Sequence, residues 1–254
     1  PTATPRPTST PIPTATPEPV ADAAEAIRAG LMSAGESSTY RMELSMNVSG
    51  NLGEGMPAAP AGEKMEMIGM RGDIDGQNSR LVLSGLLAAF LGADPEKGAE
   101  FITIDGTTYL RGPVAMLGAT DENWYELPAG QQSPTSGFSS SQITDSFSNN
   151  DVDLSGFTLA GAEELDGQQC AVFVGDKETT VALFGRLNEQ GVSSPFPIEN
   201  VDSAETRFSI CDDGRFHKMT IDVSGTPEGQ TEPSSFSLLL RLYDFGADVA
   251  ITAP

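Results

Sequence analysis

Apolar and polar residues alternate without a break over residues 40–48, YRMELSMNV. A period of two is typical of a β-strand with one buried face, which here takes Tyr40, Met42, Leu44, Met46 and Val48. The next apolar segment, Lys64–Gly72, predicts a second strand. Its alternation assigns Met65 and Met67 to one face. The opposite face takes Ile68 and Met70.

Four Asp-Gly pairs lie between further alternating segments, at residues 75–76, 105–106, 166–167 and 213–214. Asp-Gly is a preferred sequence for tight hairpin turns, so these pairs predict an antiparallel meander. The other expected strands are 79–91 (turning helical at Leu86), 101–105, 107–111, 123–127, 157–165, 168–174, 205–211, 215–223, 235–243 and 249–251. Helical periodicity appears at residues 21–33 and 178–190, which makes the fold class α+β.

Residues 1–20 differ in composition from everything that follows, because Pro, Thr, Ala and Ser make up most of them. Such a segment cannot bury apolar surface and favours extended polyproline II, so we expect a disordered stalk. The domain would then cover residues 21–254. The chain begins at Pro1 rather than Met. We therefore expect an upstream segment that carries a membrane anchor, and a location outside the cytoplasm.

The formal net charge of −22 excludes nucleic acid as a partner, because such a surface repels phosphate backbones. Cys170 and Cys211 are the two cysteines. In an exported chain an even number favours a disulfide between them, and the alternative is a pair of buried free thiols.

Candidate catalytic and metal-binding residues are few. His217 is the single histidine, and no triad or zinc spacing accompanies it. Residues 151–156 match the start of a calcium loop, but its twelfth position is Ala162 instead of Glu. Adjacent carboxylates such as Glu163 and Glu164 are expected to be solvated. We therefore predict no catalytic residue, no metal site, no cofactor and no enzymatic activity.

Methionines gather on the first two predicted strands and in the Gly- and Pro-rich loop between them, residues 51–62. Methionine is adaptable and recurs on surfaces that accept variable apolar partners. These strands could therefore line an apolar ligand cavity, or their methionines could fill an ordinary core.

Three segments resemble one known family. Residues 100–111 (EFITIDGTTYLR) with 124–127 (WYEL) are similar to the central hairpin of the LppX/LprG-type lipoproteins, relatives of the LolA/LolB lipoprotein carriers. Residues 165–173 (LDGQQCAVF) resemble their next hairpin, and residues 242–254 (LYDFGADVAITAP) resemble their closing segment. The Pro/Thr stalk is similar to those of Chloroflexi-type lipoproteins.

This resemblance implies a strongly curved antiparallel sheet, an incomplete barrel, with helices plugging its concave face. It also implies a lipid-anchored protein at the cell envelope whose cavity binds acyl chains of lipids or lipoproteins. From strand alternation and the helical stripes, the predicted cavity residues are Met42, Leu44, Met46, Met65, Met67, Leu81, Leu83, Phe138, Phe184 and Leu187. Two alternatives remain: a surface interaction or sensor domain with the same fold and a filled core, and a hydrolase of envelope polymers with two catalytic carboxylates.

Overall fold

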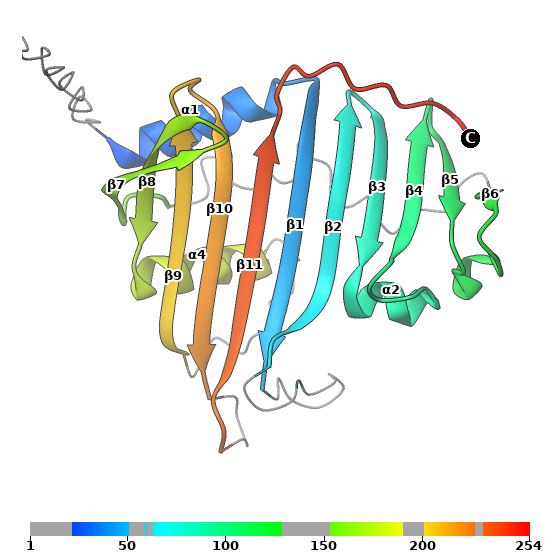
Figure 1. Cartoon of the computed structure of the whole chain (residues 1–254). Coiled ribbons are helices and arrows are strands. Elements are labelled where there is room, and N and C mark those ends of the chain that lie inside the picture. Colours follow the sequence, from blue (N-terminus) through cyan, green and yellow to red (C-terminus); the bar gives the residue numbers. More distant parts are fainter. Residues whose placement is uncertain (1–21, 51–58, 60–62, 129–152, 190–200, 227–230) are drawn as a thin grey trace, which may run out of the picture.

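The computed structural model describes residues 22–50, 59, 63–128, 153–189, 201–226 and 231–254, with the backbone only for 184–189. Eleven strands form one antiparallel sheet in the order β6-β5-β4-β3-β2-β1-β11-β10-β9-β8-β7 (Figure 1). All neighbouring strands follow one another in the sequence except β1 and β11. The sheet remains open, with β6 and β7 as its edges.

The strands are β1 (Thr39–Ser49), β2 (Met65–Asp75), β3 (Asn78–Ser84), β4 (Ala99–Ile104), β5 (Thr107–Arg111), β6 (Trp124–Glu126), β7 (Phe157–Leu165), β8 (Gln168–Gly175), β9 (Val201–Cys211), β10 (Phe216–Gly225) and β11 (Ser234–Tyr243). The predicted turns form at all four Asp-Gly pairs, although Asp75 is itself the last residue of β2 and Gly76 begins that turn. Asp105 and Asp166 adopt positive φ angles of 50° and 52°, and a glycine with positive φ follows each of them. Two successive positive φ angles are what a type I′ hairpin requires.

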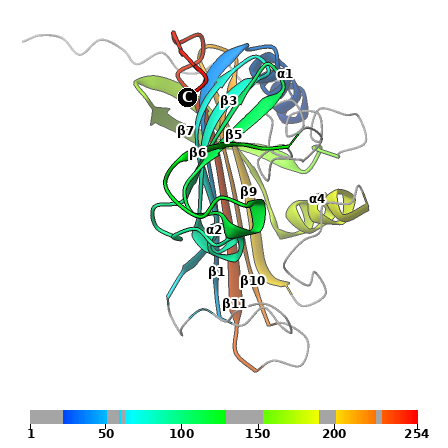
Figure 2. The ribbon, with the colours of Figure 1, turned by 90° about the vertical axis from the view of Figure 1, so that its right-hand side faces the viewer.

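The helices are α1 (Ala23–Gly35), α2 (Gly85–Leu91) and α4 (Lys177–Glu189), with a short 3₁₀ turn, η1 (Ala115–Leu117). Figure 2 shows α1 and α4 on the same side of the sheet, which we call the inner face. α1 contacts β7, β9 and β10, whereas α4 contacts β8 and β9. α2 contacts β2 and β3 at the other half of the sheet. The α+β class is confirmed, and α1 and α4 cover one face of the sheet.

α1 begins where Asp22 accepts hydrogen bonds from the backbone N–H groups of Ala24 and Glu25. Such a cap satisfies donors that the first helical turn leaves unpaired. The helix comes close to the sheet at Gly30, where a Cβ atom would lie 2.5 Å from Ile210 of β9. A side chain at this position would require Ile210 to move.

The chain after β11 closes one end of the sheet. Phe245 packs against Tyr40, with ring centroids 6.0 Å apart, and the Gly246 N–H donates to the Thr39 carbonyl. The strand predicted at residues 249–251 is wrong, because residues 247–254 have no strand conformation. β11 is already flanked by β1 and β10, so no free sheet edge lies beside this tail.

Several predictions fall on parts of the chain outside the described residues: the stalk at residues 1–20, most of the loop at 51–62, and the predicted cavity residue Phe138. Among the described helices, none combines the length and the apolar character that crossing a bilayer requires. A disulfide joins Cys170 of β8 to Cys211 of β9, which are paired directly across the two strands. The predicted disulfide between neighbouring strands is confirmed.

Candidate functional site

The inner face of the sheet is built from rows of side chains. Residues opposite one another on neighbouring strands point to the same face, so the register defines each row. One row runs through Phe173, Phe208, Met219, Leu240, Leu44, Met70, Leu83 and Ala99. A second runs through Leu242, Met42, Gly72, Leu81, Phe101, Leu110 and Tyr125. We call these two the core rows.

Two further rows, the end rows, lie beyond the first core row, toward the β1–β2 connection. They consist of Thr206, Ile221, Leu238, Met46 and Ile68, and of Ala204, Val223, Phe236, Val48 and Met65. Across the described strands, none of the four rows contains a charged residue. This matters in a chain that has 36 acidic and 14 basic residues.

Burial divides the inner face into two parts. All residues of the first core row are buried, and the Phe208 ring packs edge-on against Phe157 and Phe216. In the end rows, by contrast, four neighbouring side chains on β11, β1 and β2 are only half-buried. They are Leu238, Met46, Ile68 and Met65, and we call them the methionine patch. The patch packs against the core and still has apolar surface available.

The predicted cavity residues that the structure describes likewise fall into a buried group and a half-buried group. Met42, Leu44, Leu81 and Leu83 are 0–6% exposed and belong to the core rows. Met46 and Met65 lie in the methionine patch, and Met67 is half-buried beside it. Phe138 lies outside the described residues, as do the side chains of Phe184 and Leu187 on α4.

A β-bulge in β2 changes the faces that alternation predicts. Met46 pairs with Ile68 and Asn47 pairs with Glu66, so Met67 is the extra residue. Met65, Ile68 and Met70 consequently share the inner face, opposite Val48, Met46 and Leu44. The assignment of Ile68 and Met70 to the other face is therefore wrong, because an inserted residue shifts the alternation by one.

His217 is 2% exposed and lies within the core. Its Nε2 lies 3.1 Å from Asp213 Oδ2, and its ring packs edge-on against Phe245. Burial raises the pKa of Asp213, but hydrogen bonds from the Arg215 backbone, His217 and the Arg215 side chain outweigh it and hold that pKa below its usual value. This arrangement fastens the β9–β10 turn to the closing segment.

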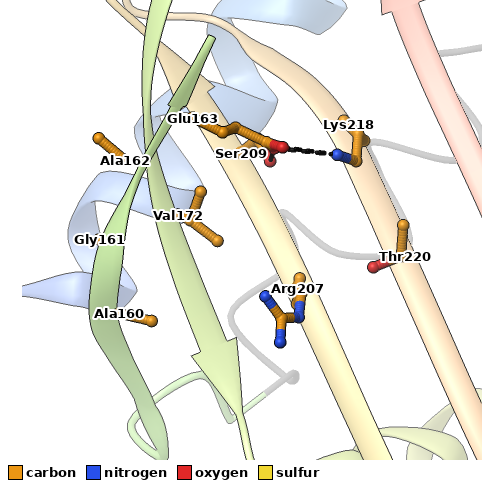
Figure 3. Close-up of a pocket in the computed structure, with 9 residues that line it drawn as sticks. All are labelled: Ala160, Gly161, Ala162, Glu163, Val172, Arg207, Ser209, Lys218 and Thr220. Carbon is orange, nitrogen blue, oxygen red and sulfur yellow. Dashed lines mark hydrogen bonds and ion pairs between the residues drawn. The ribbon is translucent and has the colours of Figure 1, made fainter. Parts of the chain in front are cut away.

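A polar pocket of about 240 Å³ lies on the outer face, over β7 to β10 (Figure 3). Lys218 Nζ lies 2.8 Å from Glu163 Oε2, and the buried Ser209 hydroxyl donates to Glu163 Oε1 at 2.5 Å. Burial raises the pKa of Glu163, but these two hydrogen bonds and the Lys218 charge outweigh that effect and hold the pKa below its usual value. An ionised carboxylate held by an ammonium group fastens β7 to β9 and β10, and Glu163 is thus not simply solvated.

We expect Glu163→Gln to lower the free energy of unfolding by about 1 kcal/mol at pH 7, because it removes a half-buried ion pair. A lowered folded-state pKa stabilises the fold above the unfolded-state pKa, and this contribution disappears as the pH falls through the folded-state pKa. The difference from wild type should therefore shrink as the pH falls from 7 through the folded-state pKa of Glu163. Urea unfolding over a series of acidic pH values measures it. Glu164→Gln, an exposed neighbour on the same strand, is the control and should change little at any of these pH values.

No group of three or more potential metal ligands occurs among the described residues, although the calcium-like segment begins at Asp151, outside them. Asp153, its second carboxylate, accepts a hydrogen bond from the Ser155 N–H.

No protein-family model matches the sequence, and a search of the curated proteins finds no match. Solved structures do match. The chain is similar to LprF from Mycobacterium bovis, with a TM-score of 0.50 and 14% identity over 91% of this chain and 96% of that one. It shares this fold. Lipoprotein LppX from Mycobacterium tuberculosis gives a TM-score of 0.47 and 15% identity over 90% and 97%. A LolA superfamily protein from Nitrosomonas europaea gives 0.30 and 11% over 91% and 97%. The fold expected from the sequence is confirmed by the likeness to LprF.

Proposed function

We propose that this chain is a non-enzymatic binding protein that sequesters the acyl chains of lipids or lipoproteins on the inner face of its sheet. One observation carries the proposal. The four rows of the inner face carry no charged residue across the described strands, the first core row is fully buried, and the methionine patch is only half-buried. Such a patch suits an apolar ligand of variable shape. The fold shared with LprF agrees with this function.

Apolar burial alone could supply the affinity. Each CH₂ group removed from water contributes about 0.8 kcal/mol, so a sixteen-carbon chain gains on the order of 10 kcal/mol before the costs of ordering it. In this proposal Met46, Met65 and Met67 contact the acyl chain. The buried residues Met42, Leu44, Leu81 and Leu83 form the floor beneath it. Phe138, Phe184 and Leu187 are proposed to cover the ligand.

We further propose that the protein works at the cell envelope, outside the cytoplasm. The disulfide fits an oxidising compartment. Residues 1–20 would hold the domain away from a membrane to which an upstream lipid anchor attaches it, and the Pro/Thr composition suits such a spacer.

Native mass spectrometry of the whole 254-residue chain, purified from a lipid-containing host, tests the function. We expect an additional mass in nearly stoichiometric amount, which organic extraction identifies as an acyl lipid. A ligand-free mass, together with no uptake of added lipid, would contradict the proposal.

The ligand-free outcome would favour a surface interaction or sensor domain with a filled core. One observation supports this second candidate, since four of the predicted cavity residues are already packed almost without exposure.

A further inference from the structure

Arginines line a groove of about 550 Å³ on the outer face of the sheet, opposite the acyl-binding side. The groove is lined by Arg41, Arg71, Gly72, Asp73, Arg80, Val82, Glu100, Arg111 and Tyr243, from β11 and β1 to β5. These strands face the viewer in Figure 1, with α1 and α4 behind them. Four of the chain's 14 basic residues thus gather in one hollow of a strongly acidic protein.

The register explains why a hollow forms here. Arg71, Val82, Glu100 and Arg111 are consecutive members of one outer-face row across β2 to β5. Arg80 lies two residues before Val82 on β3 and points to the same face. A short valine between long arginine side chains leaves a depression.

Two of the arginines are held in place by a buried carboxylate. Glu100 is 7% exposed, and its two oxygens lie 2.6 Å from Arg80 Nε and 2.6 Å from Arg111 Nη2. Arg111 also stacks over Trp124, 5.1 Å from the ring centroid. Each of these ion pairs uses one nitrogen of a guanidinium that carries five N–H donors, so donors remain for a ligand.

Arg71 completes the group from the neighbouring strand. It is exposed and has no ion-pair partner among the described residues, although Glu43 lies opposite it on β1. Arg41, at the far end of the groove, is already paired with Asp73 and Asp244. The residues that line the groove thus include four arginines and two carboxylates, Asp73 and Glu100, which leaves a formal charge of +2, and Asp73 also lies opposite Arg80 on the neighbouring strand.

We propose that Arg71, Arg80 and Arg111 bind a phosphoryl group. Guanidinium groups match phosphate oxygens with paired N–H donors, and three of them offer more donors than the two oxygens of a carboxylate accept. The groove has the size of a small-molecule site, so the phosphoryl group would belong to a larger ligand. That ligand is either a soluble phosphate ester or the headgroup of an anionic phospholipid.

The chain's single tryptophan, Trp124, provides a direct signal because it touches Arg111. Its fluorescence is titrated with glycerol 3-phosphate, with phosphatidylglycerol vesicles and with phosphatidylcholine vesicles, all at equal ionic strength. A saturable change with glycerol 3-phosphate identifies a soluble ester as sufficient. A change with phosphatidylglycerol vesicles alone identifies the membrane headgroup.

Arg71→Gln is the test variant, because Arg71 has no ion-pair partner among the described residues that its removal would leave unpaired. We expect its dissociation constant to rise at least about tenfold, as loss of one charged hydrogen-bonding group predicts. Arg207→Gln is the matched control, because it changes the net charge equally. Arg207 lies on the same outer face outside the groove and is paired with Glu205. Three results would overturn the proposal. Both variants could weaken binding equally, phosphatidylcholine vesicles could give the same response as phosphatidylglycerol vesicles, or no probe could give a saturable response. Acyl binding on the inner face is measured separately and does not decide it.

Discussion

Removing the Cys170–Cys211 disulfide is expected to lower the free energy of unfolding by about 4 kcal/mol. The bond closes a loop with a sequence separation of 41 residues, and the loop-entropy relation gives this value for a loop of that length. It also ties the edge hairpin of β7 and β8 to β9, next to the Glu163–Lys218 ion pair. The melting temperature should fall by roughly 10 °C.

The measurement is denaturant unfolding of the wild type and of the Cys170→Ala/Cys211→Ala double variant, each with and without a reductant. Alanine is chosen because both positions are buried and alanine adds no polar group there. Reduced wild type should approach the double variant, whereas the reductant should not affect the variant itself. An oxidised wild type whose mass does not increase by two hydrogen atoms on reduction would falsify the disulfide.

Most elements could be predicted because their signals are local. Asp-Gly turns and strict alternation place β1, β3, β5, β8 and β11 within a few residues of their observed bounds. The switch from strand to helix is also local: Leu86 was the expected start of the helix, and α2 begins at Gly85. Each of these signals depends only on residues a few positions apart.

What the sequence could not supply is information that depends on the partner strand. The bulge at Met67 is defined by the register against β1, so alternation alone placed Ile68 and Met70 on the wrong face. β1 and β11 lie near opposite ends of the domain's sequence, and their pairing brings Leu238 beside Met46. No short-range sequence pattern indicates this pairing. The arginine groove likewise forms from six strands, and its four arginines are scattered in sequence.

The second large effect concerns the methionine patch. Met65→Asp is expected to weaken binding of an acyl lipid at least about thirtyfold, because a carboxylate placed in an apolar site loses its hydration without gaining a partner. Met65 is the first residue of β2 and is half-buried, so the fold should tolerate the change better than at the core rows. Displacement of Nile red by the lipid measures the affinity. This dye is neutral, so the arginines of the outer face should not attract it.

Met116→Asp is the matched control, because it makes the same chemical change outside the methionine patch. Met116 lies in η1 and is 72% exposed. Circular dichroism and thermal unfolding establish that both variants are folded. If Met65→Asp retains wild-type affinity while folded, the acyl chain does not lie on the methionine patch. If both variants weaken binding equally, added negative charge rather than the local loss of apolar surface is responsible. Selective weakening by Met65→Asp alone places the acyl chain on the half-buried end of the inner face, where β11, β1 and β2 meet.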